Sequence, residues 1–318
     1  MEGIKTHSKA LKCLDSLSFN KDGQIAIIGS NLTSRTWNGM LAIYSDPKFA
    51  PEIPHIDAAV VTDAGNSDVS WVDDKQLIVA SDTGAIDLWT IQNSNGTLEN
   101  SISFHEHDDI CSSVSLDPSR IQFASSSWDG CVKVWDLAIE VSVHTFRAHA
   151  GKVLSVAWSQ KYGDLTSSAS DDGDIFVYDV RDAKPASLLA HEKTSYPCSV
   201  TWHPTDTKIV VGYSDGRISL FDMRNRGQHV LTYKAHAKNT NCVAFCPTRD
   251  NMIASVSDDQ TLHVQESDQN TALLHRKVHS DYVKGLAWDL NRISCWTCAW
   301  DGKVLETMVD KDKMDLDD

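Results

Sequence analysis

One turn-and-strand pattern recurs at a nearly constant interval along most of the chain. Its clearest copy, residues 127–136, reads S-W-D-G-C-V-K-V-W-D, in which Asp129-Gly130 is typical of a tight turn and the following valines alternate as in a half-buried strand. The aligned turn positions are 42 to 46 residues apart and are Gly39, Gly84, Gly130, Gly173, Gly216, Gln260 and Gly302. Seven positions predict seven copies of one supersecondary unit.

A histidine precedes five of these turns by 22 to 24 residues. The histidines are His107, His149, His191, His236 and His279, and the turn aspartates that follow them are Asp129, Asp172, Asp215, Asp259 and Asp301. A pair that occurs five times is expected to build the repeat, because function usually lies in sites grafted onto a fold. We therefore expect each turn aspartate to accept a hydrogen bond from its histidine ring.

A period in the forties that contains His, a turn Asp and Trp-Asp resembles the WD repeat. The resemblance extends from about residue 13 to residue 309. It implies an all-β, seven-bladed β-propeller that forms a single domain over residues 1–309. Residues 310–318 contain five aspartates and are expected to form an acidic, disordered tail.

Blade seven is expected to supply three strands, near residues 283–288, 293–299 and 303–309, whereas a propeller blade needs four. We expect a segment near residues 3–6 to supply the fourth strand, so that the ring closes by pairing of the N-terminal and C-terminal segments. Between Asp46 and Ser67, three prolines withhold backbone donors, and this stretch is interpreted as a long surface loop.

The chain carries 44 acidic and 29 basic residues, with a net charge of −15. This balance argues against direct binding to nucleic acid, which needs clustered Lys and Arg. It fits a basic protein partner, or it serves solubility alone. No apolar run is long enough to span a bilayer and no signal peptide is evident, so we expect no membrane association, a cytoplasmic and nuclear location, and reduced cysteines.

No catalytic motif is evident: a phosphate loop, a nucleophile elbow and HExxH are all missing from the sequence. The C-W-T-C run at Cys295 and Cys298 lies in a predicted strand, where residues three apart face opposite sides. Both thiols are therefore not expected to reach one metal ion. We expect a protein that is not an enzyme and that has no metal site and no cofactor.

The residues immediately before the turn aspartate positions are the candidates for a binding site. They are Trp37, Asp82, Trp128, Asp171, Ser214, Asp258 and Trp300. In WD-repeat propellers these positions ring one mouth of the central channel, and exposed tryptophans are common anchors of binding hot spots. The alternative is that the indole rings fold back onto Arg35, His275 or adjoining loops and merely cover the blade tops.

Several motifs outside the generic repeat carry a closer resemblance. They are S-R-T-W-N-G, E-H-D-D-I, V-K-V-W-D-L-A, R-A-H-A, K-P-A-S and T-W-H-P. They resemble the WD-repeat subunit of the methylosome, the partner of the arginine methyltransferase that makes symmetric dimethylarginine. The resemblance implies a hetero-octamer in which Arg35 and Trp37 contact the methyltransferase, and in which histone tails and spliceosomal Sm proteins are presented as substrates.

Two alternatives remain open. Arg181 and Arg224 each follow a strand-end aspartate by two residues in successive blades. This pair resembles the motif by which WD-repeat substrate receptors attach to cullin ubiquitin ligases, although each Arg also has acids nearby to pair with. The other alternative is a histone-binding propeller that acts without a methyltransferase.

Overall fold

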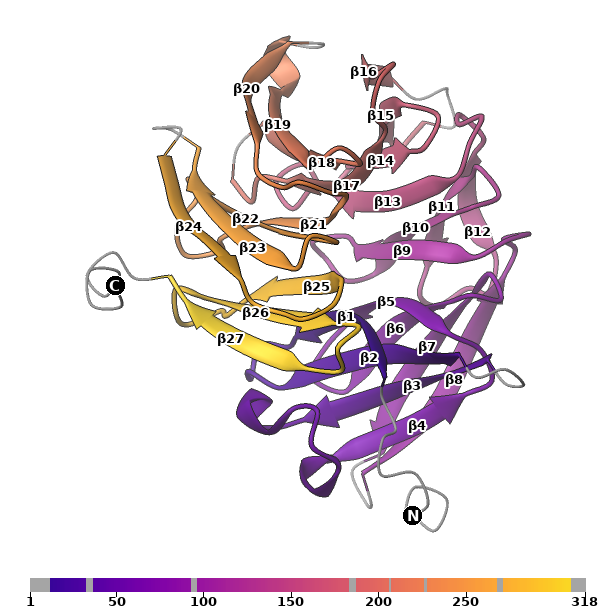
Figure 1. Cartoon of the computed structure of the whole chain (residues 1–318). Helices are drawn as coiled ribbons and strands as arrows, with labels where there is room; N and C mark the ends of the chain where they lie inside the picture. The colour runs from indigo at the N-terminus through magenta and orange to yellow at the C-terminus, as the bar shows by residue number, and fades with distance from the viewer. Residues whose placement is uncertain are drawn as a thin grey trace, which may run out of the picture.

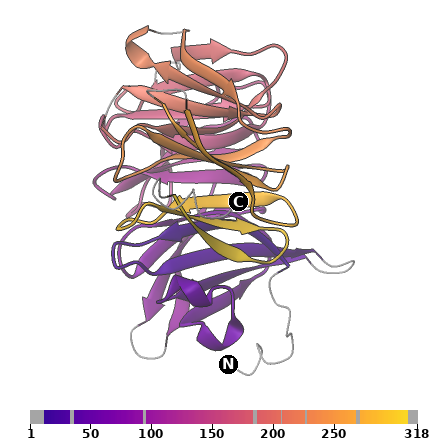
Figure 2. The same ribbon diagram turned by 60° about the vertical axis from the view of Figure 1, so that its left-hand side comes forward.

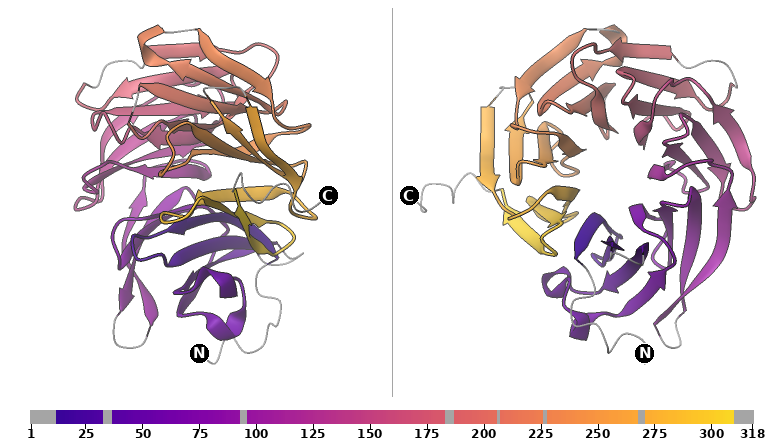
Figure 3. Two further views of the ribbon diagram at one scale, coloured as in Figure 1. Left: turned by 90° about the vertical axis from the view of Figure 1, so that its left-hand side faces the viewer. Right: turned by 45° about the vertical axis from the view of Figure 1, so that its right-hand side comes forward.

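The computed structural model of the chain describes residues 12–32, 37–92, 96–182, 187–205, 207–225, 228–267 and 271–309. In these residues, 27 strands form seven antiparallel sheets, and three 3-10 helices of three residues each lie between strands. The sheets follow one another around a ring, with the first strand of each sheet toward the axis (Figure 1; Figure 3, right). The fold is an all-β, seven-bladed propeller, as the repeat predicted.

Each of the first six blades is a four-stranded meander in chain order. Blades one to three contain β1 (Cys13–Phe19), β2 (Ile25–Leu32), β3 (Trp37–Tyr44), β4 (Ala58–Thr62), β5 (Asn66–Trp71), β6 (Gln76–Ser81), β7 (Ala85–Gln92), β8 (Thr97–His105), β9 (Cys111–Leu116), β10 (Gln122–Ser127), β11 (Val132–Asp136) and β12 (Ser142–Phe146). Blades four to seven contain β13 (Val153–Trp158), β14 (Leu165–Ser170), β15 (Asp174–Asp179), β16 (Ser187–His191), β17 (Pro197–Trp202), β18 (Lys208–Tyr213), β19 (Arg217–Asp222), β20 (His229–Lys234), β21 (Thr240–Phe245), β22 (Met252–Ser257), β23 (Thr261–Glu266), β24 (Thr271–Lys277), β25 (Val283–Trp288), β26 (Ser294–Ala299) and β27 (Val304–Met308).

The turns between the second and third strands of blades two to seven explain the recurring glycine. The turn residue has a positive φ in all six, for example 80° at Gly130 and 75° at Gln260. A Cβ at Gly130 would also lie 3.2 Å from the carbonyl oxygen of His149. Glycine adopts this backbone conformation without a steric cost, whereas Gln260 adopts it against its own side chain.

The core consists of seven apolar clusters, one between each pair of neighbouring blades. Alternate residues of the middle strands face opposite sides of a sheet and therefore enter different clusters. The cluster that closes the ring joins Leu14 and Leu17 of β1 to Trp296, Cys298 and Val304 of blade seven. Every blade thus shares its apolar surface with two neighbours, so the ring is the unit that buries the core.

Blade seven has three strands among the described residues, β25, β26 and β27. Their bounds agree with the predicted ranges to within one residue. The segment near residues 3–6, which the sequence predicts as the fourth strand, lies outside the described residues, as does the predicted acidic tail. The pairing of the two chain ends therefore stays a prediction.

Blade one differs from the prediction in two ways. Gly39 lies inside β3, where it pairs with Ser30 of β2, because the β2–β3 hairpin extends as far as the Leu32–Trp37 pair. The expected loop between Asp46 and Ser67 contains two 3-10 helices, Pro47–Phe49 and Ile53–His55, and then the outer strand β4. The helices are the indigo and purple coils outside blade one in Figures 1 and 2.

The prolines explain this second difference. They hold residues 47–55 out of the sheet, but the A-A-V-V-T segment of β4 has no proline and is free to pair with β3. No helix in the described part of the chain is long and apolar enough to cross a membrane.

Candidate functional site

The residues before the turns lie around one mouth of the central channel. Six of them donate the same backbone hydrogen bond, from their own N–H to the carbonyl of the residue that precedes the innermost strand of their blade. The pairs, donor first, are Asp82–Gly65, Trp128–Ile110, Asp171–Lys152, Ser214–Tyr196, Asp258–Asn239 and Trp300–Tyr282. One repeated contact therefore places side chains of different chemistry at equivalent points around the mouth. We call these residues and Trp37 the rim.

A cavity of about 580 Å³ lies under the rim. Trp37, Trp128 and Trp300 all line it, although they belong to blades one, three and seven. Their exposed fractions are 51 %, 36 % and 37 %, respectively. The three predicted tryptophans thus meet at one cavity and keep large exposed areas. Trp37 is the most exposed because its hairpin extends beyond the turn position of the other blades.

Two of the tryptophans donate to carboxylates of the next blade around the ring. The Nε1 of Trp37 in blade one lies 2.7 Å from Oδ2 of Asp82 in blade two. The Nε1 of Trp300 in blade seven lies 2.8 Å from Oδ1 of Asp15 in blade one, and Asp15 also accepts from the hydroxyl of Ser30 at 2.6 Å. These bonds fix the edges of the indoles and leave their faces partly open.

Lysines cover part of the remaining aromatic surface. The Nζ of Lys152 lies 3.7 Å from the ring centroid of Trp128. The Nζ of Lys284 lies 5.0 Å from the ring centroid of Trp300 and 3.0 Å from Oδ1 of Asp258. Cation–π contacts of this kind are worth about 0.5–1 kcal/mol at exposed sites. The mouth therefore combines aromatic faces with charges of both signs.

The two carboxylates that accept from the tryptophans, Asp15 and Asp82, are in similar electrostatic environments. Burial raises the pKa of Asp15, and the hydrogen bonds from Ser30 and Trp300 offset this only in part. Burial likewise raises the pKa of Asp82 against the opposing hydrogen bond from Trp37. Both carboxylates have therefore lost water contacts and depend on the hydrogen bonds that they accept.

The other predicted rim residues make local contacts. Asp171 accepts from the backbone N–H of Lys152 at 2.6 Å. Asp258 accepts from the side chains of Asn241 and Lys284. Arg35 lies outside the described residues, so its predicted partner contact stays a prediction.

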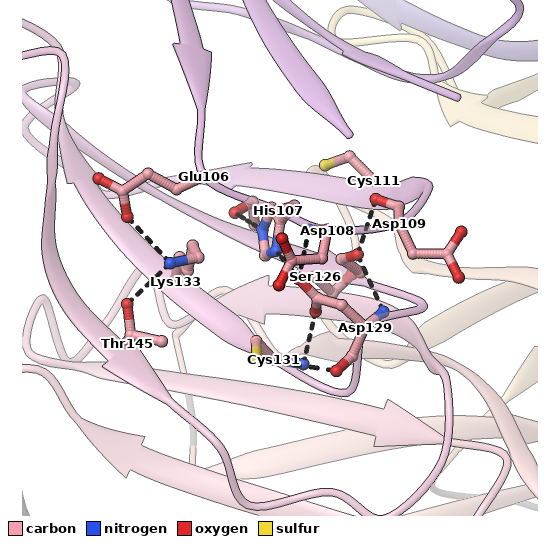
Figure 4. A network of polar contacts seen from close by, with 12 residues as sticks. Glu106, His107, Asp108, Asp109, Cys111, Ser126, Asp129, Cys131, Lys133 and Thr145 are labelled. Carbon is pink, nitrogen blue, oxygen red and sulfur yellow. Dashed lines mark hydrogen bonds and ion pairs between the residues drawn. The ribbon is translucent and has the colours of Figure 1, made fainter. Parts of the chain in front are cut away.

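The histidines of the repeat form cross-braces below the rim. In blade three, His107 Nδ1 lies 2.8 Å from Asp129 and His107 Nε2 lies 2.7 Å from the hydroxyl of Ser125, which also accepts from Trp135 Nε1 at 2.8 Å. Figure 4 shows His107 and Asp129 pointing toward each other, beside the ion pair between Lys133 and Glu106. This brace links the loop before the blade, the turn and the third strand.

Three further blades repeat the brace. His149 contacts Asp172 and Ser168, His279 contacts Asp301 and Thr297, and His236 contacts Thr261 and Ser255 with Asp259 at 3.4 Å. In each brace the turn aspartate also accepts the backbone N–H of the residue after the histidine. Four of the five predicted pairs are thus close neighbours.

Burial and hydrogen bonding oppose each other in these pairs. Burial raises the pKa of Asp129, but the hydrogen bonds from His107 and from the backbone outweigh it and hold this pKa below its usual range. Burial lowers the pKa of His149 and outweighs the attraction of Asp172. The brace of blade four therefore combines an ionised Asp172, whose pKa is also lowered, with a histidine ring that resists protonation.

The pair predicted in blade five is not formed. His191 Nδ1 lies 2.6 Å from Asp174, directly opposite in the β15–β16 register, and not against Asp215. The reason is that His191 is still part of strand β16, whereas the other four histidines follow the end of an outer strand. Arg217 occupies this region instead: it donates to Glu192 and Ser195 and lies 3.8 Å from Asp215.

The C-W-T-C cysteines face different neighbours. Cys295 packs in the cluster between blades six and seven, and Cys298 packs in the cluster between blades seven and one. The two thiols therefore lie on opposite sides of β26, as the alternation of a strand requires. Within the described residues, no group of three or more His, Cys, Asp and Glu side chains is arranged to hold a metal ion.

Sequence reasoning missed Asp15, Tyr196, Asn241 and Lys284, which also line the cavity. Asp15 is separated from its partner Trp300 by 285 residues, and only closure of the ring brings the two together. The usable signal was position along the innermost strands: Tyr196 immediately precedes one, Asn241 and Lys284 are the second residues of theirs, and Asp15 is the third residue of its strand. The second residue of the innermost strand lines the cavity in blades two to seven; these residues are Ser67, Ser112, Leu154, Cys198, Asn241 and Lys284.

Comparison with known proteins agrees with this architecture. The family model described as "WD domain, G-beta repeat" matches residues 98–136 and 140–179, and that described as "Anaphase-promoting complex subunit 4 WD40 domain" matches residues 164–248. The "Methylosome protein WDR77" of Xenopus laevis is 34 % identical over 295 residues, which cover 92 % of this chain and 88 % of that protein. The chain belongs to the WDR77 family of WD-repeat proteins.

More distant relatives share only part of the ring with this WDR77 family member. "E3 ubiquitin-protein ligase COP1" of Arabidopsis thaliana is 29 % identical over 50 % of this chain and 23 % of its own length. "Gem-associated protein 5" of Homo sapiens is 23 % identical over 55 % of this chain and 12 % of its own length. The similarity to the WDR77 protein, in contrast, extends through nearly all blades.

Proposed function

We propose that the protein is a non-catalytic scaffold subunit of a protein arginine methyltransferase complex and that the rim docks the methyltransferase. The family membership supports the complex, because the WDR77 relative is named as a methylosome protein. The observation that carries the docking site is the group of three exposed tryptophans at one cavity. Exposed indoles that surround a cavity are typical anchors of protein interfaces.

The roles within this surface differ. Trp37 is the main apolar anchor, because it is half exposed and stands on the extended hairpin of blade one. Arg35 precedes it by two residues and offers a fork of donors to a carboxylate or carbonyl of the partner. Trp128, Trp300, Asp82, Asp171 and Asp258 complete the contact around the mouth.

The net charge of −15 supports a second part of the proposal. An acidic scaffold attracts Arg-rich substrates, here histone tails and Sm proteins, and presents them to the methyltransferase within a hetero-octamer. Such attraction raises the rate of capture and weakens as salt is added. The complex would act in the cytoplasm and the nucleus, without a cofactor in this subunit.

Substitution of Trp37 tests the docking site. Trp37→Ala is expected to weaken binding of the co-purifying methyltransferase by more than about 1 kcal/mol in a calorimetric titration, with the fold unchanged by circular dichroism. Ile139→Ala is the control, because Ile139 is similarly exposed but lies in the turn between β11 and β12, at the opposite end of the strands. Equal affinity of Trp37→Ala and the unsubstituted protein would remove Trp37 from the site.

A second candidate function rests on Arg181 and Arg224. Each guanidinium donates two hydrogen bonds to the aspartate two residues before it, Asp179 and Asp222, and both arginines are exposed on neighbouring blades. Arg181 also lies 3.2 Å from Asp164. The recurrence of the same exposed arginine–aspartate pair on successive blades is the observation that supports a receptor for a cullin ubiquitin ligase. Recovery of a cullin adaptor, lost on Arg181→Ala with Arg224→Ala, would support it. Recovery of histones with neither enzyme would support a free histone-binding propeller.

A further inference from the structure

Trp37 and Trp300 are the two rim tryptophans whose N–H groups are taken up by a neighbouring blade. Trp37 donates to Asp82 at 2.7 Å and Trp300 donates to Asp15 at 2.8 Å. Within the part of the chain that the structure describes, the Nε1 of Trp128 donates to no carboxylate, and the Nζ of Lys152 lies 3.7 Å from the centroid of its ring. The rim therefore holds its tryptophans in two different ways.

The contact between Trp37 and Asp82 is closely packed. Gly65 immediately precedes β5, and a Cβ at this position would lie 2.1 Å from Oδ2 of Asp82 and 2.4 Å from Nε1 of Trp37. No side chain fits there without displacing one of the two. The backbone carbonyl of Gly65 also accepts the N–H of Asp82 at 2.9 Å, which holds the main chain of Asp82 beside the start of β5. Glycine at this point therefore leaves the space in which the two side chains meet.

A fixed indole is a better anchor than a mobile one. Immobilising a flexible side chain at an interface costs about 0.5–1.5 kcal/mol, and a side chain that is already fixed avoids this cost. The hydrogen bond to Asp82 holds one edge of the Trp37 ring, while half of its surface stays open to solvent. The same argument applies to Trp300 and Asp15.

We propose that Asp82 and Asp15 are positioning residues, which hold Trp37 and Trp300 with their ring faces toward the docked methyltransferase, and that Gly65 provides the space for the first of these contacts. This inference rests on the proposed function of the rim. In this proposal the two acids act by orienting the indole rings and not only by their negative charge. The partner is the same methyltransferase, bound through the faces of the two indoles.

Four variants test the proposal by calorimetric titration with the co-purifying methyltransferase. Asp82→Ala is expected to weaken binding about threefold to tenfold, because the indole must then be ordered on docking. Asp82→Asn retains an acceptor oxygen and is expected to bind nearly as the unsubstituted protein does. Gly65→Ala is expected to behave as Asp82→Ala does. Asp73→Ala is the matched control: it removes the same charge from blade two, at an exposed acid that accepts backbone N–H groups in the turn between β5 and β6, away from the rim.

The indole N–H resonance of Trp37 in a ¹⁵N-tryptophan-labelled sample provides a readout that does not depend on affinity. It is expected to shift in Asp82→Ala and Gly65→Ala, and to stay near its original position in Asp82→Asn and Asp73→Ala. Equal losses of affinity in Asp82→Ala and Asp73→Ala would mean that charge alone matters and would overturn the inference, as would an unshifted resonance in Asp82→Ala.

Failure of the inference and failure of the proposed function give different results. If Trp37→Ala weakens binding and Asp82→Ala does not, the rim docks the methyltransferase but Asp82 does not position the anchor. If Trp37→Ala itself leaves the affinity unchanged, the docking site is wrong, and the positioning role is overturned with it.

Discussion

The brace of blade three and the rim contact of blades one and two use nearly the same hydrogen bond. His107 and Asp129 are joined at 2.8 Å, and Trp37 and Asp82 at 2.7 Å. In both, a ring N–H meets an aspartate. The surroundings differ: the side chains of His107 and Asp129 are 0 % and 8 % exposed, whereas Trp37 is 51 % exposed.

This difference separates what builds the ring from what the ring displays. Loss of a partner inside the protein leaves a polar group without water or a hydrogen bond, and this is costly. Loss of a partner at the rim leaves groups that water can reach. The same pair of chemical groups therefore determines stability in one place and the orientation of a binding side chain in the other.

Breaking the buried contact should give the largest effect. Asp129→Ala is expected to lower the free energy of unfolding by about 3 kcal/mol, because His107 and two backbone N–H groups lose their acceptor. Urea denaturation followed by circular dichroism measures this. Asp82→Ala is the matched variant at the rim and is expected to lose less than about 1 kcal/mol. Similar losses in the two variants would contradict the comparison.

A fall in pH should lower the stability of the folded ring through its buried histidines. Burial lowers the pKa of His149 and His279 below its ordinary value of about 6.5, and it lowers that of His263, near the blade-six brace, to about 4. Below pH 6.5 the unfolded chain therefore binds more protons than the folded one, so stability is lost as the pH falls toward the folded pKa values. Each unit of difference is worth about 1.4 kcal/mol.

The pH prediction is tested by urea denaturation at pH 7 and pH 5. The midpoint should be lower at pH 5, and a variant with His149→Gln and His279→Gln should show a weaker dependence on pH. Below about pH 4 a further loss is expected, because the pKa values of Asp129 and Asp301 are lowered in the folded state. Greater stability at pH 5 than at pH 7 would contradict the assignment.

Blade five allows an exposed His–Asp pair to be compared with a buried one within the same repeat. His191 pairs with Asp174 at the surface, with side-chain exposures of 44 % and 26 %. His191→Ala is therefore expected to cost less than about 1 kcal/mol of stability, whereas His107→Ala is expected to cost about 2–3 kcal/mol. Thermal and urea denaturation of both variants measure the difference. A loss for His191→Ala as large as that for His107→Ala would show that His191 stabilises blade five as the buried histidines stabilise theirs.

The smallest effect is expected where a lysine covers a rim tryptophan. Lys152→Met removes the charge over Trp128 and should change the free energy of unfolding by only about 0.5 kcal/mol. The fluorescence of Trp128 should change because its ring loses the neighbouring charge. A stability loss above about 2 kcal/mol would assign Lys152 to the framework of the ring and not to its surface.

The repeat made most of the fold predictable from sequence. A pattern with one period determines the number of blades, the order of the strands and the place of each turn, because every copy must bury its faces against the next. The outer strand β4 was missed because the prolines at 47, 51 and 54 masked a short strand without a strong signal of its own. His191 was misplaced because a constant spacing does not show where the preceding strand ends.

The candidate site was predictable in its positions but not in its contacts. The equivalence of Trp37, Trp128 and Trp300 follows from the repeat, so their common location at the mouth could be predicted. Which acid each indole meets depends on neighbouring blades, and for Trp300 on closure of the ring onto Asp15. Side chains that meet across a closed ring leave no periodic signal in the sequence.

Ring closure also determines how the molecule responds to force. Six of the seven interfaces between blades are spanned by the continuous chain, but the one between Leu14 and Trp296 joins strands from opposite ends of it and is held by packing and hydrogen bonds. Tension applied between the two ends therefore falls first on this seam. A partner that covers blades seven, one and two would act as a clasp across it.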